Sequence, residues 1–314
     1  MKKFLQTLAL FLAIPATAGM AWIAFAVIHD RASYTGALAA PPSARVAVCG
    51  DSQTKDALSP ELFPGLFNFS TAATTCDQDA MRLQDVLAAN PGRFTHAIID
   101  ASPLKIGHDE SRPVSELNAA RVHLLLHIYH LKDAKRPLGS VSRLLRDVIF
   151  TRKFNEFRKS ILRGKPWRSS MAGAFAPEKE RGFLNPKLRA KAEADLAEKA
   201  GRVNSRPPAG ESLQYFAALE RQVASARAAG AKPVFSTMPL SRPLRDAIDP
   251  ARLAAFSGVM RGLAKRLDVP YLDFLEYDLP LECWHDGNHL NREGANLFTP
   301  VFRDAFEKAS ALVR

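Results

Sequence analysis

Hydrophobic and polar positions follow two alternating patterns along this chain. Five short runs are mostly apolar, which is typical of strands buried on both faces of a sheet; they are Arg45–Cys49, Leu66–Phe69, Thr95–Ile99, Pro233–Thr237 and Val269–Phe274. Between them apolar residues recur at spacings of three and four, which predicts helices; the clearest are Met81–Ala89, Ser212–Ala229 and Ala251–Leu267. Alternating strands and helices predict an α/β fold with a parallel sheet between helical layers.

The pattern changes between about residues 105 and 210, where the sequence is basic and helical without a convincing strand. We interpret this part as a helical insertion in the α/β domain. From Lys132 to Arg168 it contains 12 lysines and arginines against three acidic residues. Such a stretch is either a solvated helical face or a surface that binds anionic lipid or polymer.

The composition indicates a globular protein with anionic partners. Of 314 residues, 47% are hydrophobic and 24% are charged, as in ordinary globular domains. Lysine and arginine number 43 against 32 aspartates and glutamates, a formal net charge of +11. This excess favours anionic lipid or an anionic polysaccharide. Nucleic acid is not expected as a partner, because no recognition motif is visible.

The N-terminal segment predicts a membrane anchor. Residues from Phe4 to Ile28 carry no charge, which is long enough for one transmembrane helix, and Lys2 and Lys3 before them should stay in the cytoplasm. We therefore expect an anchor over residues 1–31, a tether over 32–43 and the folded domain over 44–314. In a bacterium this places a single-pass protein in the inner membrane, with the domain in the periplasm. The alternative is a signal peptide cleaved after Ala18, although the apolar run continues beyond that position.

Two segments at predicted carboxyl ends of strands carry the candidate chemistry, and ligands of α/β sheets bind at those ends. Gly50-Asp51-Ser52 follows the first strand, and Asp286-Gly287-Asn288-His289 follows the last. Aspartate and histidine three residues apart in a turn can hydrogen-bond, so that the carboxylate orients the imidazole toward a serine. Ser52, His289 and Asp286 thus form a candidate triad of nucleophile, base and orienting acid. His285 is the alternative base, but it lies beside Asp286 at an unsuitable spacing.

Each half of this triad also has a structural interpretation, since Gly-Asp-Ser and Asp-x-x-His are common in turns. No metal or other cofactor is expected. His123, His127 and His130 share a predicted helical face, but no acidic ligand accompanies them.

The three cysteines are too few for a disulfide framework. Cys76 and Cys283 follow the second and fifth predicted strands, so they could meet at the edge of the site and form one bridge. Cys49 ends the first strand and should be buried and reduced.

The quoted motifs resemble the SGNH (GDSL-type) hydrolase superfamily: Gly50-Asp51-Ser52, the Asn68-Phe69-Ser70 segment, and the run from Asp286 to Asn291 ahead of Gly294. With the N-terminal anchor, they resemble the membrane-anchored group that includes the teichoic-acid D-alanine transfer protein and the alginate O-acetylation proteins. The resemblance covers about Arg45–Asp100 and Lys232 to the end. It implies a three-layer α/β/α sandwich with a flavodoxin-like sheet, and an acyl-serine intermediate on Ser52.

The resemblance also implies a function and a partner. The chain would modify a cell-envelope polysaccharide as an acyltransferase or acylesterase, beside a multipass membrane acyltransferase. Where typical esterases of the superfamily have Gly-x-Asn-Asp, whose asparagine holds the oxyanion, this chain has Asp100-Ala101-Ser102-Pro103. Its oxyanion donors must therefore lie elsewhere, at the Ser52 backbone amide or in a group near Asn68–Thr71. The candidate residues for oxyanion or substrate binding are Asp51, Asn68, Ser70 and Ser102. The missing asparagine favours the alternative of a non-catalytic scaffold or polysaccharide-binding protein with the same fold.

Overall fold

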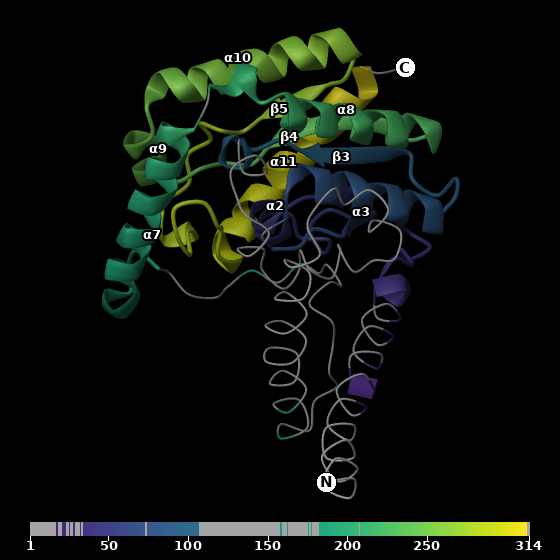
Figure 1. Cartoon of the computed structure of the whole chain (residues 1–314), viewed down its shortest axis with the longest axis horizontal. Helices are drawn as coiled ribbons and strands as arrows, with labels where there is room; N and C mark the ends of the chain where they lie inside the picture. Colours follow the sequence, from purple (N-terminus) through teal and green to yellow (C-terminus); the bar gives the residue numbers. More distant parts are fainter. Residues whose placement is uncertain are drawn as a thin grey trace, which may run out of the picture. The chain divides into compact units, whose positions relative to one another are not determined.

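The computed structural model describes residues 34–72, 74–106, 182–206 and 208–312, with a few single residues outside these ranges. The chain divides into two compact units, one of Met1–Ala37 and Arg112–Ala172, the other of Leu38–Ser111 and Gly173–Arg314. All helices and strands named below belong to the second unit (Figure 1).

Five parallel strands form one sheet in the order β2-β1-β3-β4-β5. This is the order of flavodoxin-like doubly wound sheets. The strands are β1 Val46–Cys49, β2 Leu66–Asn68, β3 His96–Asp100, β4 Lys232–Thr237 and β5 Tyr271–Asp273. Each lies within or beside a predicted apolar run, and the predicted α/β fold with a parallel sheet is confirmed.

Helices connect these strands, and one more helix follows the last strand. They are α2 Ser52–Ala57, α3 Cys76–Ala89, α7 Pro186–Ser205, α8 Leu213–Ala228, α9 Arg242–Ala247, α10 Pro250–Leu267 and α11 Arg292–Leu312, with single 3₁₀ turns η1 Pro103–Lys105, η4 Ala209–Glu211 and η5 Leu281–Cys283. Helix α3 begins earlier than its apolar pattern predicts, because Thr75 and Gln78 form a capping box.

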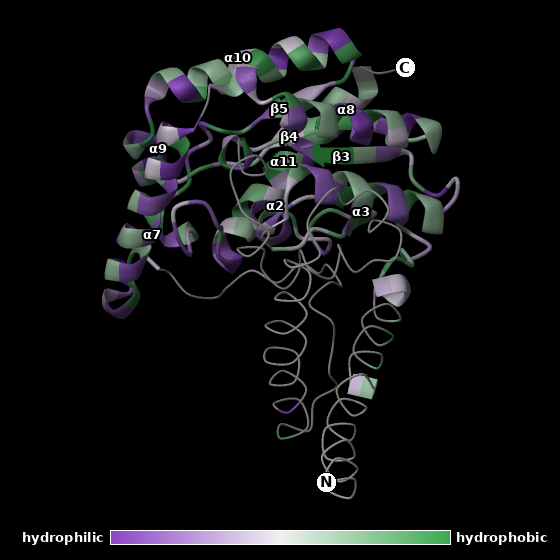
Figure 2. Cartoon of the chain, viewed as in Figure 1, coloured by the Kyte–Doolittle hydropathy of each residue, from purple (hydrophilic) through white to green (hydrophobic). Residues whose placement is uncertain are grey.

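Helices cover both faces of the sheet. Helices α3 and α8 pack against each other and against β1, β3 and β4 on one face, and α10 is joined to α8 by the Arg266–Glu220 ion pair. On the other face α2 and α11 are in contact, and Phe298 and Phe302 belong to the same buried cluster as Val48. Figure 2 shows hydrophobic colour along β3 and alternating hydrophilic and hydrophobic turns along α10. The three-layer arrangement leaves the carboxyl ends of the strands for the loops that carry the candidate chemistry.

Residues 38–40, in the predicted tether, are already attached to the α/β unit. The Asn90 side chain, which follows α3, accepts a hydrogen bond from the Ala40 amide (3.0 Å) and donates one to the Leu38 carbonyl (2.8 Å). Both Leu38 and Ala40 are buried. The last part of the predicted tether therefore packs on the domain.

Several predicted features lie outside the described residues. These are most of the Phe4–Ile28 anchor, most of the basic stretch from Lys132 to Arg168, and the histidines His123, His127 and His130. Among the helices that the structure does describe, none combines the length and the apolar character that a bilayer span requires.

Candidate active site

Ser52 lies in the turn that joins β1 to α2. Gly50 permits this turn, because a Cβ atom at position 50 would lie 2.8 Å from Asp100 Cβ and 2.8 Å from Thr54 Oγ1. Those separations are shorter than non-bonded contacts allow, so only glycine fits between β3 and α2. The turn places Ser52 at the carboxyl edge of the sheet, where α/β folds bind their ligands.

Asp51 is the N-cap of α2. Its Oδ1 accepts a hydrogen bond of 2.8 Å from the Gln53 amide, which satisfies one of the donors that the first helical turn leaves over. Ser52 is the first residue of the helix, so its own amide has no acceptor within α2. This amide is a candidate donor to an oxyanion on an acyl group attached to Ser52.

The second candidate segment is a loop that folds back on itself between η5 and α11. An isolated antiparallel bridge joins Trp284 to Leu290 across it. Inside the loop, Asp286 Oδ1 accepts hydrogen bonds from the amides of Asn288 (2.9 Å) and His289 (3.0 Å). The carboxylate therefore shapes the loop as well as contacting the histidine ring.

The structure brings the three predicted triad residues together. Ser52 Oγ lies 2.7 Å from His289 Nε2, although 237 positions separate the two residues in sequence. His289 Nδ1 lies 2.9 Å from Asp286 Oδ1 and 2.8 Å from Oδ2. With the aspartate on Nδ1, Nε2 can accept the serine proton, which is the arrangement that activates a serine for acyl transfer.

The charge of Asp286 is stabilised from two sides. Burial alone would raise its pKa, but the hydrogen bond and charge of His289 and the charge of Lys199 outweigh burial and hold the pKa well below its usual range. Lys199 Nζ lies 2.9 Å from Asp286 Oδ2 and also donates to Asn288 Oδ1. The acid is thus ionised at neutral pH.

His285, the alternative base, is not part of this arrangement. Its amide donates to the His289 carbonyl (2.9 Å), and its buried Nδ1 has no hydrogen-bond partner in the described part of the chain. The geometry therefore selects His289 as the residue that faces Ser52.

A buried cluster of charges lies directly behind the Ser52 turn. Lys105 Nζ lies 2.5 Å from Asp100 Oδ2, 2.8 Å from Asp79 Oδ2 and 3.7 Å from Asp51 Oδ2. Lys105, Asp79 and Asp100 are each at most 5% exposed. The Lys105 ammonium is the cation that these carboxylates contact. No group of metal-binding side chains is found among the residues described.

The cluster holds more carboxyl groups than its single cation can balance. Burial raises the pKa of Asp51 to about 6 and also raises that of Asp79, while the Lys105 charge opposes both shifts. Burial alone would lower the pKa of Lys105, but Asp100, Asp51 and Asp79 raise it well above its usual value. The lysine is therefore charged, and Asp51 and Asp79 retain protons at higher pH than exposed aspartates do.

The side chain of Asn68, one of the predicted oxyanion residues, is engaged within the fold, and so is the amide of Ser70, another of them. Asn68 Nδ2 donates to the carbonyls of Leu58 (2.9 Å) and Thr54 (3.2 Å), and its Oδ1 accepts from the Ser70 amide (3.1 Å). These bonds fasten the end of β2 to α2. Ser70 is fully buried, and its Oγ has no hydrogen-bond partner among the described residues.

The backbone between Asn68 and Thr71 is also occupied. The amides of Phe69 and Thr71 donate to the carbonyls of Val48 (2.9 Å) and Gly50 (3.0 Å). Together with the Ser70 amide, they are used within the fold, so the amides of residues 69–71 are not available to an oxyanion. The Ser52 amide is left as the backbone candidate.

Ser102 is linked to the site through Gln53. Gln53 was not among the residues predicted from the sequence. Ser102 Oγ donates to Gln53 Oε1 (2.8 Å), and Gln53 Nε2 donates to the Asn288 carbonyl (3.3 Å). Gln53 is buried and thereby links the end of β3 to the loop that carries His289. Lys105 and Lys199 were also missed. Asp100, at the end of β3, had a positional signal, whereas nothing in the sequence indicated the two lysines.

The predicted bridge between Cys76 and Cys283 is not formed: neither cysteine belongs to a disulfide, and both are buried. Cys283 packs in the core on the α11 side, whereas the Cys76 Sγ contacts the Gln222 amide of α8 on the opposite face. Cys49 is buried and free, as expected. Burial raises the pKa of its thiol to about 12, so it is unreactive in the folded protein.

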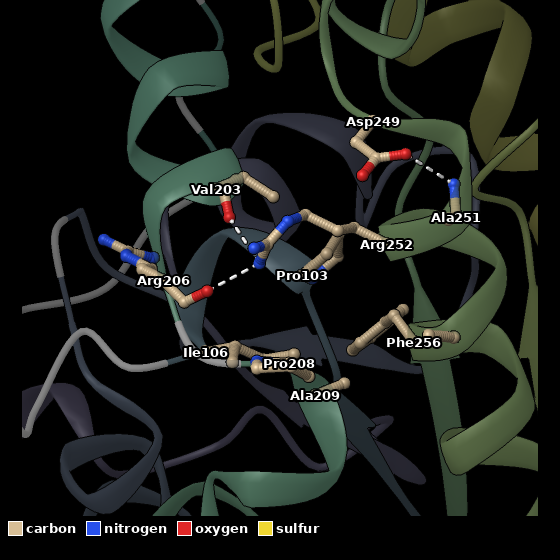
Figure 3. A pocket seen from close by; sticks show the side chains of 11 residues that line it. Pro103, Ile106, Val203, Arg206, Pro208, Ala209, Asp249, Ala251, Arg252 and Phe256 are labelled. Carbon is tan, nitrogen blue, oxygen red and sulfur yellow. Dashed lines mark hydrogen bonds between the residues drawn. The ribbon is translucent and has the colours of Figure 1, made fainter.

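A pocket of about 260 Å³ lies between the end of α7, η1, η4 and the start of α10 (Figure 3). Its walls are mainly apolar, including Ile106 and Phe256. Arg252 closes one side by donating to the carbonyls of Val203 (3.2 Å) and Arg206 (2.6 Å). No triad residue lines this pocket, so it is separate from the reacting groups.

Comparisons with known proteins add only distant likenesses. No protein-family model matches the chain, and no curated protein sequence matches it. It is similar in structure to a putative acylhydrolase from Bacteroides fragilis, with 13% identity over 84% of this chain and 86% of the other and a TM-score of 0.39. It is also similar to a GDSL-like lipase from Bacteroides thetaiotaomicron, with 14% identity over 90% and 98% and a TM-score of 0.43. Both TM-scores lie below 0.5, so neither likeness bears on the function of this chain.

Proposed function

We propose that this chain is a serine enzyme of acyl transfer, in which Ser52 carries the acyl group. The observation that supports this function is the 2.7 Å contact between Ser52 Oγ and His289 Nε2, with Asp286 on the other ring nitrogen. A serine hydroxyl is a weak nucleophile until a base accepts its proton. Here the base is in contact with the hydroxyl and is oriented by an ionised carboxylate.

The reaction would proceed in two half-reactions. His289 Nε2 takes the Ser52 proton while Oγ attacks the carbonyl carbon of an acyl ester, and the carbonyl oxygen becomes an oxyanion. When this intermediate collapses, the alcohol leaves with the proton from His289, and the acyl group remains on Ser52. A second hydroxyl, from water or a sugar, then gives its proton to His289 and attacks the acyl-serine, which regenerates the hydroxyl of Ser52.

The acceptor in this proposal is a cell-envelope polysaccharide. Its support is the sequence: the resemblance to envelope acylation proteins, the uncharged Phe4–Ile28 segment and the basic stretch from Lys132 to Arg168. The chain would be held in the inner membrane with its domain in the periplasm, and a multipass membrane acyltransferase would supply the acyl group. Mass spectrometry of the mature N-terminus tests the anchor, since a chain that begins after Ala18 would be a released protein.

Charge reversal in the basic stretch tests whether this chain binds an anionic partner. Reversing four of its charges to glutamate should weaken binding to anionic vesicles or anionic polysaccharide, and added salt should weaken wild-type binding; the four are Arg143, Arg146, Arg152 and Lys153. Binding that is insensitive to both changes would leave the stretch as a solvated face.

A second candidate function is a non-catalytic scaffold that keeps this fold and binds polysaccharide. It is favoured by the shortage of oxyanion donors around Ser52, since the amides of residues 69–71 are used within the fold and position 102 is serine rather than asparagine. Loss of one oxyanion donor typically costs about a hundredfold or more in rate. Positioning of a bound polymer could compensate in part.

A fluorophosphonate probe applied to the full chain separates the two functions, because it labels an activated serine without requiring the natural substrate. Ser52→Ala and His289→Ala should each abolish labelling, and the double variant should be no worse than either single one. Asp286→Asn should slow labelling by up to about ten-thousandfold. His285→Ala is the matched control and should label almost normally. An unlabelled wild type, with Ser52→Ala still supporting polysaccharide acylation in a deletion strain, would favour the scaffold.

A further inference from the structure

Helix α7 belongs to the part of the chain that interrupts the alternation of strands and helices, yet it packs on the loop that carries His289. Just before the helix, the Gly182 amide donates to the Trp284 carbonyl (3.2 Å). A Cβ at position 182 would lie 1.7 Å from the His285 carbonyl oxygen, so the approach of the two backbones requires glycine. Near the C-terminal end of α7, Lys199 reaches the same loop.

Lys199 is the cation that contacts the triad acid. Its Nζ lies 2.9 Å from Asp286 Oδ2, donates to Asn288 Oδ1, and belongs to a side chain that is 15% exposed. The other lysines of α7 near this region point to solvent; Lys191 is 73% exposed and pairs with Asp195. The contact is therefore specific to position 199 rather than a general property of a basic helix.

We propose that Lys199 is a positioning residue that sets the pH range in which His289 acts as the base. The proposal rests on the proposed acyl transfer. The ammonium holds Asp286 in the orientation that faces His289 Nδ1, and its positive charge offsets part of the carboxylate field at the imidazole. Because the same field favours a protonated ring, Lys199 keeps the ring unprotonated, and able to accept the Ser52 proton, at lower pH.

Neither of the other two titratable residues of the site, Asp51 and His285, pairs with Asp286 through its side chain in the described part of the chain. Asp51, at the start of α2, lies within the Lys105 cluster and shares that lysine with Asp79 and Asp100. His285, beside Asp286, makes no side-chain hydrogen bond to it among the described contacts. Among the described groups that contact Asp286, Lys199 supplies its positive charge from α7, outside the loop. A substitution at position 199 therefore removes that charge without altering the loop backbone.

The test compares variants of the full chain by their rate of fluorophosphonate labelling between pH 5 and 9. Lys199→Met should move the acid limb of the profile up by about one pH unit, the effect of one unit charge roughly 6 Å away in a partly screened site. Labelling below the midpoint should then be about tenfold slower than wild type. Lys199→Gln, which keeps a hydrogen-bond donor without the charge, should behave like Lys199→Met. Lys199→Arg should restore the wild-type profile.

Lys191→Met is the matched control, since it removes an equal charge from the exposed face of the same helix. It should leave the profile unchanged. Circular dichroism checks that each variant is folded, and a misfolded Lys199→Met would be replaced in the comparison by Lys199→Gln. A Lys199→Gln profile that coincides with wild type would overturn the proposal.

A second readout does not depend on activity. The Nδ1 proton of His289 should give a low-field proton NMR resonance, identified by its absence in His289→Gln, whose shift follows ring protonation. Its titration midpoint should rise in Lys199→Met and Lys199→Gln and stay in place in Lys191→Met. If wild type were never labelled, the acyl-transfer proposal would fail while this midpoint still decided the role of Lys199. A midpoint that does not move in either variant would show that Lys199 has only a structural role.

Discussion

Replacing Asp51 with asparagine should make this protein more stable at neutral pH. Asp51 shares one lysine with two other buried carboxylates, and its own side chain is 13% exposed. Burial raises the pKa of this carboxyl from 3.8 to about 6. Asparagine cannot ionise, yet its side-chain oxygen can still accept the Gln53 amide bond that caps α2.

The magnitude follows from the pKa. Because the folded pKa lies above the unfolded one, the folded state retains a proton that the unfolded state releases between about pH 4 and pH 6. The associated stabilisation is complete below about pH 4 and is lost as the pH rises through about 6. A shift of roughly two units corresponds to about 3 kcal/mol. Asp51→Asn should therefore match wild type near pH 4 and exceed it by up to about 3 kcal/mol at pH 7.

Urea unfolding at both pH values, followed by tryptophan fluorescence, measures the difference, since Trp284 is buried in the core. Asp51→Ala removes the cap as well and should be less stable than Asp51→Asn by about 1 kcal/mol. Asp246→Asn, on the exposed side of α9, should change stability by less than about 0.5 kcal/mol at either pH. A stability difference between Asp51→Asn and wild type that is equal at pH 4 and pH 7 would refute the reasoning.

Three further predictions concern the buried lysine, the Gly50 turn and the cysteines. Lys105→Met should lower the unfolding free energy by about 3–5 kcal/mol at pH 7, because it leaves buried carboxylates without their cation, and the loss should shrink at pH 4 as they gain protons; a loss that does not depend on pH would contradict this. Gly50→Ala should displace the Ser52 turn and slow fluorophosphonate labelling, since its Cβ would lie 2.8 Å from side-chain atoms of Asp100 in β3 and Thr54 in α2; unchanged labelling would show that the turn can relax. Aromatic disulfide reagents should modify no cysteine in the folded domain and all three after unfolding without reductant; two unreactive thiols in the unfolded chain would reveal a bridge that the structure lacks.

Local sequence determined the elements and the chemistry that each could carry. Strands such as Val46–Cys49 are buried on both faces, so their apolar runs are continuous and can be recognised in any window of the sequence. The Asp286–His289 contact is also local, because a turn of four residues suffices to bring a carboxylate to the ring. The Gly50-Asp51-Ser52 turn at the end of a strand is local for the same reason, because its residue types are typical of turns.

The oxyanion candidates show where local pattern stops. Asn68 has the right residue type at the right strand end, yet its amide bonds to the carbonyls of Leu58 and Thr54. Which of its neighbours a polar side chain satisfies depends on how β2 and α2 approach each other, and no periodicity records that approach. The cysteine pair failed for the same reason, since the two thiols ended on opposite faces of the sheet.

The tertiary structure alone decided which distant groups meet. Ser52 and His289 could be paired from the rule that parallel strands end at one edge, but only the order of the strands brings them to 2.7 Å. Nothing in the sequence marked Lys199 or Lys105, because a single lysine in a basic helix or after a strand looks like any solvated charge. Their roles come from burial beside carboxylates that other elements contribute. Whether a charge is buried depends on the residues that fold around it, and the hydrophobic pattern of the sequence does not record this.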